Sequence, residues 1–195
     1  MDSQRFDRQL RFVVEIDKLK RVLRQTTLMD ATRNENSAEH SWHLALMALL
    51  LAEYSSRPVD LARVVRMVLV HDLVEIDAGD TFCYDADANL DKEERERRAA
   101  ERVFGLLPGD QGVELKGIWE EFEEMETPEA RFANALDRLQ PLLHNLHNGG
   151  GTWRIHGVAR EQVLERMRPI GVAMPELWPF VENALARAAE EGWVR

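Results

Sequence analysis

One stretch of helical periodicity constrains the fold of this chain more than any other feature, because its apolar face runs into charged groups. Its aliphatic residues recur at positions i, i+3, i+4 and i+7, which predicts a helix with one buried side. They are Leu61, Val64, Val65 and Val68. Continued along the helix, the same face reaches His71, Asp72 and Glu75. Buried ionisable groups must be paired, hydrogen-bonded or bound to a metal ion. The stretch therefore predicts either a satisfied core histidine or a binding site.

The spacing of these three residues favours one shared site. On a helix, Glu75 lies four residues from His71 and three from Asp72, so the three side chains can meet. Gly79 then predicts the end of the helix, and Asp80 follows in the loop.

Most of the chain has helical periodicity, and no stretch alternates as a strand would. We expect an all-α fold of seven or eight helices in a single domain, residues 1–195. Besides the helix that begins at Leu61, the predicted helices cover residues 3–20, 38–55, 91–106, 111–125, 128–147, 158–169 and 176–191. Residues 25–37 are expected to form a loop, with Ser37 as the N-cap of the following helix. In helix 111–125 the residues expected to face inward are Val113, Ile118, Trp119, Phe122 and Met125.

Charge and composition narrow the class of function. The net charge of −10 argues against binding to a nucleic-acid polymer, which needs a broad basic surface. A small anionic substrate stays possible, because a bound cation and a few arginines can act locally. The single cysteine, Cys83, allows no intramolecular disulfide, as in proteins of the reducing cytoplasm. No signal-peptide core or membrane-spanning apolar run is present, so we expect a cytoplasmic protein without membrane contact.

Four residues from three predicted helices form a candidate metal site. His40, His71, Asp72 and Asp137 each lie at or near an inward face. Two imidazoles and two carboxylates make a mixed nitrogen and oxygen site, which suits a divalent transition metal. Such an ion polarises a phosphoryl oxygen and activates water. Glu75 is close enough to accept or orient the proton of that water.

Three segments of the chain resemble the HD-domain metal-dependent phosphohydrolases, in particular their 5′-deoxynucleotidase-like branch. The first is Arg33-Asn34-Glu35-Asn36-Ser37-Ala38-Glu39-His40-Ser41, the second is His71-Asp72-x-x-Glu75-x-x-x-x-Asp80, and the third is Ala135-Leu136-Asp137-Arg138-Leu139. The resemblance covers about residues 15–150. A lone His-Asp pair is a weak signal, but the full set in this order is specific.

The resemblance implies an all-α helical bundle, one divalent ion and often a homodimer. The ion is commonly manganese, cobalt, iron or zinc, with magnesium possible. The implied reaction is hydrolysis of a small phosphate ester, typically a deoxynucleoside 5′-monophosphate, by metal-activated water. By position, the implied metal ligands are His40, His71, Asp72 and Asp137.

The resemblance also implies roles for four further residues. Glu75 handles the attacking water. Asp80 contacts the sugar and is the next candidate for the catalytic carboxylate. Arg21 holds the phosphate, although Val22 stands where the family has a tryptophan. Arg33 is either a second phosphate contact or a structural partner of an acidic neighbour.

Several alternatives stay open. A second metal would need further histidines after the His-Asp pair, and none occurs between His71 and His144, so one ion is expected. His144 and His147 are expected to be polar residues near the site or exposed ones. Hydrolysis of a nucleoside di- or triphosphate would need more cations, for which Lys20, Arg24, Arg33 and Lys116 are candidates. A non-catalytic, metal-stabilised binding module is the third possibility.

Two other segments have a candidate role. Residues 81–87 are aperiodic and acidic, which is typical either of a loop that lines a site or of a solvated connection. The C-terminal aromatic residues either cap the monomer core or form part of a dimer interface. They are Trp178, Phe180 and Trp193.

Overall fold

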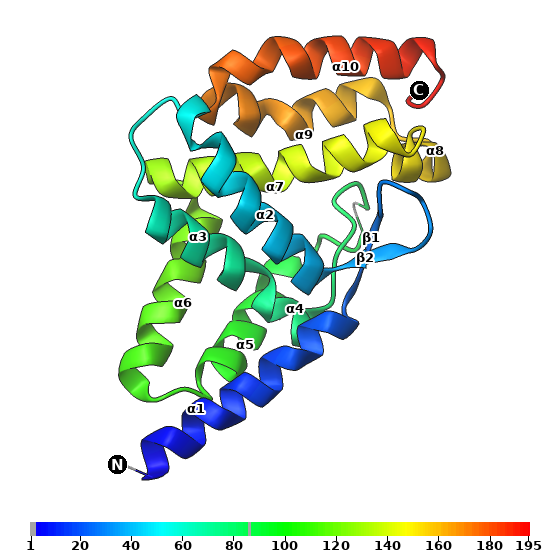
Figure 1. The fold of residues 1–195 in the computed structure, drawn as a ribbon. Coiled ribbons are helices and arrows are strands. Elements are labelled where there is room, and N and C mark those ends of the chain that lie inside the picture. The colour runs from blue at the N-terminus through cyan, green and yellow to red at the C-terminus, as the bar shows by residue number, and fades with distance from the viewer. Residues whose placement is uncertain (1–2, 86) are drawn as a thin grey trace.

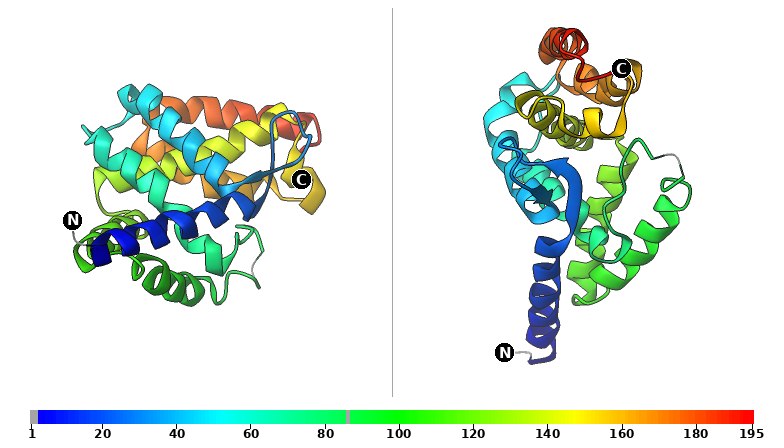
Figure 2. Two further views of the ribbon diagram at one scale, coloured as in Figure 1. Left: turned by 60° about the horizontal axis from the view of Figure 1, so that its bottom comes forward. Right: turned by 90° about the vertical axis from the view of Figure 1, so that its right-hand side faces the viewer.

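Helices dominate the computed structural model, which describes residues 3–85 and 87–195 (Figures 1 and 2). The α-helices are α1 (Ser3–Ile16), α2 (Ser37–Leu51), α3 (Leu61–Val70), α4 (Glu75–Ala78), α5 (Lys92–Phe104), α6 (Gly109–Glu124), α7 (Pro128–His147), α8 (Gly151–His156), α9 (Arg160–Ala173) and α10 (Trp178–Glu190). The predicted all-α class is confirmed. The described residues hold ten α-helices rather than seven or eight, because α4 and α8 are too short to give a periodic signal.

Helix α7 lies at the centre of the fold and packs against α2, α3, α6 and α9 (Figure 1). Its limits agree with the prediction, and its start was predictable because neighbouring residues alone define it. The side chain of Thr127 accepts a hydrogen bond from the Ala130 amide, and Pro128 occupies the first helical position. Buried residues follow most of its length, so α7 connects the two layers of helices seen on either side of it.

Residues 25–37 are not simply a loop, and this expectation was wrong. Strands β1 (Leu23–Thr27) and β2 (Asn34–Asn36) pair antiparallel, with an irregular register between the paired positions. Both strands are short and mostly polar, so the alternation that predicts a strand is missing. Asn36, not Ser37, is the N-cap of α2, and it forms a capping box with Glu39.

The segment with the His-Asp pair changes its helical geometry. Helix α3 ends at Val70, residues His71–Val74 form a 3-10 turn, and α4 follows. In such a turn residues three apart project in the same direction, which applies to Asp72 and Glu75. Gly79 ends α4 with φ of +74°, the left-handed region that favours glycine. The shared site predicted for these residues therefore forms through a tighter turn than a continuous α-helix.

Helix α6 agrees with the prediction at its centre and differs at its ends. Ile118, Trp119 and Phe122 are buried, but Val113 is 76% exposed. Val113 precedes Ile118 by five positions, which puts it far around the helix from the buried side. Met125 lies beyond the helix in a left-handed conformation and is also exposed. In residues 3–85 and 87–195, no helix has both the length and the apolarity to cross a membrane.

Candidate metal centre

The fold brings together the four residues that the sequence proposes as metal ligands. His40 comes from α2, His71 and Asp72 from the turn after α3, and Asp137 from α7. His40 Nε2 lies 2.8 Å from Asp137 Oδ1, and His71 Nε2 lies 3.8 Å from the same oxygen. His71 Nε2 is also 3.0 Å from Asp72 Oδ1. All four side chains are almost completely buried, so their donor atoms face one another rather than water.

The hydrogen bonds around these ligands fit a metal ion. The carbonyl oxygen of Val68 can only accept, so His71 Nδ1, 3.0 Å away, carries the proton and donates it. This leaves the lone pair of Nε2 directed at the centre, and Nε2 is buried without a hydrogen-bond partner. On the other imidazole, His40 Nδ1 lies 3.6 Å from Glu35 Oε2. Orientation of ligand histidines by backbone carbonyls and carboxylates is the usual outer shell of a metal site.

The charges of the centre favour a cation. Burial disfavours the charged form of His71, but Asp72 and Asp137 outweigh this and raise its pKa to about 9. Burial also opposes ionisation of Asp137, yet Arg138 and His40 hold its pKa well below 3.8. The centre thus stabilises positive charge at His71 and negative charge at Asp137, which suits a bound cation.

Glu75 and Asp80 lie beside this quartet and line the same cavity. The Ser37 hydroxyl donates a 2.6 Å hydrogen bond to Glu75 Oε2. Burial, followed by the charge of Asp72, raises the pKa of Glu75 well above 4.5. Asp80 accepts a hydrogen bond from the Gln25 amide at 3.2 Å, and burial raises its pKa as well. Both carboxylates are therefore held in place at the edge of the centre.

The structure does not bring Arg21 into this cavity. Arg21 is exposed at the end of the turn before β1, whereas Arg24 lines the cavity. Arg24 Nη1 donates a 2.8 Å hydrogen bond to Asp72 Oδ2 and lies 3.8 Å from Asp80 Oδ1. Its buried Nε has no hydrogen-bond partner and faces Glu35 Oε2 at 3.6 Å. The two arginines are only three residues apart, but Arg21 ends the turn before β1, whereas Arg24 lies within β1.

The other candidate cations have structural partners outside the cavity. Arg33 forms a two-pronged ion pair with Glu39 at 2.7 and 2.9 Å, so it braces the capping box of α2. Lys20 pairs with Asp17, and Lys116 pairs with Glu101 at 2.7 Å. Lys20, Arg33 and Lys116, which were candidates to bind a longer phosphate chain, therefore do not join Arg24 at the cavity.

Aromatic and basic side chains complete the wall of the cavity. The loop after Asp80 contributes Phe82, Cys83 and Tyr84, in agreement with its predicted role as a lining loop. Ala86, in the same predicted loop, lies outside the described residues. Trp153 from α8 and Arg166 from α9 also line the cavity, although sequence reasoning did not select them. Their sequence separation from the ligands leaves no local signal that could have identified them.

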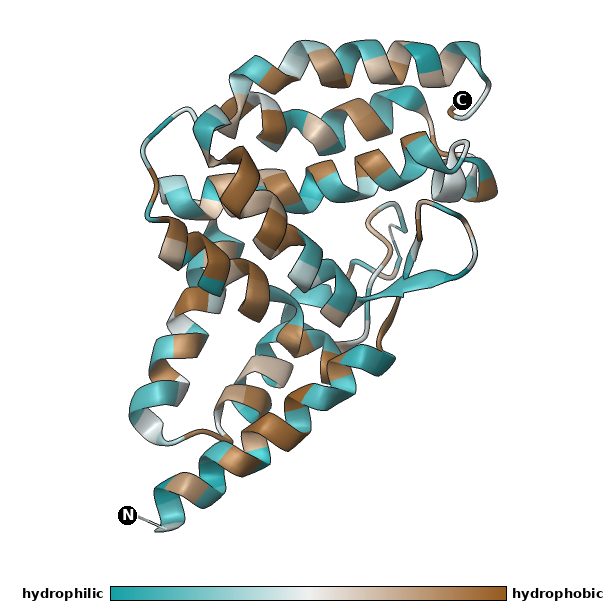
Figure 3. Ribbon diagram, in the orientation of Figure 1, coloured by the Kyte–Doolittle hydropathy of each residue, from teal (hydrophilic) through white to brown (hydrophobic). Residues whose placement is uncertain are grey.

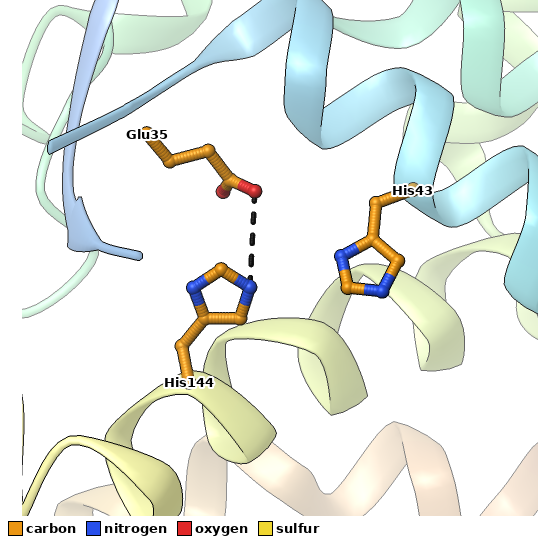
Figure 4. A group of neighbouring side chains, drawn as sticks. All are labelled: Glu35, His43 and His144. Carbon is orange, nitrogen blue, oxygen red and sulfur yellow. Dashed lines mark ion pairs between the residues drawn. The ribbon is translucent and has the colours of Figure 1, made fainter. Parts of the chain in front are cut away.

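A second group of potential ligands was also missed by sequence reasoning. Glu35, His43 and His144 lie together (Figure 4), and Glu35 Oε1 is the oxygen near His144, whereas Oε2 is the one near His40. No role was predicted for His43, and His144 was expected to be a polar residue near the site or an exposed one. His144 is buried, whereas His147, one turn later, is exposed as expected.

Comparison with known proteins gives consistent matches along the chain. Residues 16–178 match the family model described as HD domain. The chain is 33% identical over 138 residues to the 5'-deoxynucleotidase HDDC2 of Xenopus laevis, covering 70% of this chain and 67% of that protein. It is 31% identical over 138 residues to the protein of the same name from Danio rerio, covering 70% and 68%.

A solved structure is more similar still. A protein from Magnetospirillum magnetotacticum MS-1, described as a predicted metal-dependent phosphohydrolase, superimposes with a TM-score of 0.93. The two chains are 54% identical, and the match covers 97% of this chain and 95% of the other. The family match, the fold and the convergence of two histidines with two aspartates lead to one conclusion: this chain belongs to the HD-domain family.

Proposed function

We propose that the protein is a metal-dependent phosphohydrolase that releases phosphate from a small phosphate ester, a deoxynucleoside 5′-monophosphate or a close relative of one. The observation that carries the proposal is that His71, Asp72 and Asp137, with His40 behind them, share one cavity with Glu75 and Asp80. A site that only stabilised the fold would not need these two additional buried carboxylates. The names of the curated relatives and of the bacterial structure support the same reaction class.

The proposed roles follow from the positions of the side chains. His40, His71, Asp72 and Asp137 would hold one divalent ion, which supplies Lewis acidity toward a phosphoryl oxygen when it is bound. Glu75 takes up the proton of the attacking water, and Ser37 orients its carboxylate through the 2.6 Å hydrogen bond. Asp80 contacts the sugar at the other edge of the cavity.

The cavity wall has groups that suit a nucleotide. Phe82, Tyr84 and Trp153 offer apolar faces on which a base can pack. Arg24 provides cationic donors for a phosphate, while Arg33, Lys20 and Lys116 are engaged elsewhere. We also propose that residues 1–195 form one domain, because residues from Phe12 to Val194 contribute to one hydrophobic cluster.

A screen of phosphorylated metabolites tests the proposed function. Phosphate release is measured for nucleoside mono-, di- and triphosphates in the presence of manganese, cobalt, iron, zinc or magnesium. We expect metal-dependent release from deoxynucleoside monophosphates, abolished by a chelator. Turnover of triphosphates in preference to monophosphates would contradict the substrate class, and failure of every phosphate ester would support a non-catalytic module.

Arg24, rather than Arg21, is proposed to bind the phosphate of the substrate. In Arg24→Lys the positive charge beside Asp72 is kept, but the planar fork of donors is lost. A hydrogen bond to a charged group contributes about 1.5–3 kcal/mol, so kcat/KM should fall about 10- to 100-fold while metal content is retained. Arg21→Ala is the matched control, because Arg21 is exposed three residues away. A loss confined to Arg21→Ala would restore the assignment made from the resemblance.

We also propose that the protein is a homodimer and that α2 forms part of the interface. Leu46, Leu49 and Leu50 lie on one side of α2, and the last two are 56% and 72% exposed. Leu69 of the adjacent α3 is also exposed, and Figure 3 shows hydrophobic colour concentrated in these two helices. The C-terminal aromatic residues are weaker candidates, because Trp178 and Trp193 pack against the core, leaving Phe180 more exposed.

Light scattering tests this assembly. We expect a mass near twice the 22.5 kDa of one chain at micromolar concentration. Leu50→Glu should shift the mass toward the monomer, because it buries a charge in the proposed interface. Val113→Glu, which changes an exposed apolar residue of α6 outside this group of leucines, should not. A wild-type monomer would contradict the proposal.

A further inference from the structure

A second cluster of ligand-type side chains lies outside the proposed active site. Glu35 comes from β2, His43 from α2 and His144 from α7. One ligand atom from each lies within 4.8 Å of the other two, and Figure 4 shows the three side chains converging. Glu35 and His144 are buried and His43 is partly buried, so the cluster is part of the interior rather than a chance surface grouping.

The hydrogen bond of His144 to the backbone leaves one ring nitrogen available for a cation. His144 Nδ1 lies 2.8 Å from the carbonyl oxygen of Thr27, which can only accept, so Nδ1 carries the proton. Nε2 therefore directs its lone pair into the cluster, the orientation that a backbone carbonyl gives to a metal-ligating histidine.

The hydrogen bonds inside the cluster do not provide a donor for every buried acceptor atom. Gln140 Nε2 lies 2.5 Å from Glu35 Oε1, 2.9 Å from His144 Nε2 and 3.4 Å from His43 Nδ1. An amide group has two protons for these three acceptors. Gln140 Oε1 is buried without any hydrogen-bond partner. Acceptors thus exceed donors in a buried space, which a positive ion would correct.

We propose that Glu35, His43 and His144 form a second binding site for a divalent transition-metal ion. Two imidazoles and one carboxylate suit zinc or cobalt. Rotation of the Gln140 amide by a half-turn would present its oxygen as a fourth donor. A cavity of about 340 Å³ bordered by Leu28, Met29 and Trp42 gives the ion a path from solvent. The guanidinium of Arg33 borders the same cavity, but Glu39 neutralises it.

Glu35 places the second site next to the first. Its Oε1 lies 3.8 Å from His144 Nε2, while its Oε2 lies 3.6 Å from His40 Nδ1 and 3.6 Å from Arg24 Nε. An ion that engages Oε1 fixes the carboxylate that supports both His40 and Arg24. The second site is therefore a structural support for the proposed active site and does not need to take part in hydrolysis.

Metal content measured on matched variants tests the proposal. Protein stripped by a chelator is reloaded with excess zinc or cobalt and desalted, and the ions per chain are counted by elemental analysis. We expect about two ions in the wild type, about one in His43→Ala and about one in His71→Ala, with none in the double variant. His147→Ala is the control, because His147 is exposed and its Nδ1 donates to Leu143 within the same helix. It should retain both ions.

The outcomes separate this proposal from the proposed function. A wild type with one ion, lost in His71→Ala, would overturn the second site and leave the first intact. Two ions in His43→Ala would overturn the ligand assignment. Circular dichroism verifies folding, and His43→Gln, which keeps a polar side chain of similar size, provides a second variant that should also lose one ion.

Discussion

Glu75→Gln is expected to lower kcat by about 10²–10⁴-fold, the usual contribution of a general base, while the protein keeps its fold and its metal. Glutamine has nearly the same size as glutamate and can still accept the 2.6 Å hydrogen bond from Ser37. It cannot accept a proton from water. The loss should therefore appear in kcat more than in KM, and the melting temperature should change little.

Asp77→Asn is a matched control for this variant. Asp77 lies on the same short helix, α4, but it is exposed and pairs with Arg102 away from the cavity. Its turnover should equal that of the wild type. If the turnover of Glu75→Gln stays within about threefold of the wild type, Glu75 is not the general base, and Asp80 becomes the next candidate. Loss of the metal as well would show that Glu75 supports or contacts the ion.

His71→Ala is expected to remove the ion of the first site and to reduce turnover to that of the chelator-treated wild type. The imidazole Nε2 lies within 3.8 Å of both Asp72 and Asp137, so its loss removes one partner from each of two buried carboxylates. A ligand at a thousand times its Kd stabilises the native state by about 4 kcal/mol. The variant should therefore also melt at a lower temperature than the metal-loaded wild type.

Elemental analysis, thermal melting and turnover on one preparation check this prediction. His147→Ala serves again as the control, because it removes an exposed imidazole without changing the centre. We expect one ion fewer per chain in His71→Ala and an unchanged count in the control. Full metal retention with full activity in His71→Ala would remove His71 from the ligand set.

Much of the fold was predictable because its signals are local. Thr127 and Pro128 fix the start of α7, and Gly79 ends α4, through backbone preferences that neighbouring residues alone decide. The apolar spacing from Leu61 to Val68 defines the buried face of α3 in the same way. This face runs into His71 and Asp72, so the sequence also indicated where a buried polar site must be satisfied.

Other features depend on contacts between distant segments. The strands β1 and β2 are stabilised by pairing with each other, not by an alternating pattern, so the polar sequence gave no indication of them. Arg24 lies on β1 and lines the cavity, whereas Arg21, three residues earlier, is exposed. Which of two nearby arginines reaches a site is decided by the path of the backbone, which the residue types do not specify.

The two histidine groups show the same division. His40, His71, Asp72 and Asp137 could be assigned to one site from the order and spacing of the motif residues. Only the tertiary structure decided that His43 and His144 meet at Glu35. His43 is about a hundred residues from His144 and from Gln140 in the sequence. No local pattern links these residues. Their proximity results from the packing of α2 on α7, which is set by apolar side chains elsewhere on both helices.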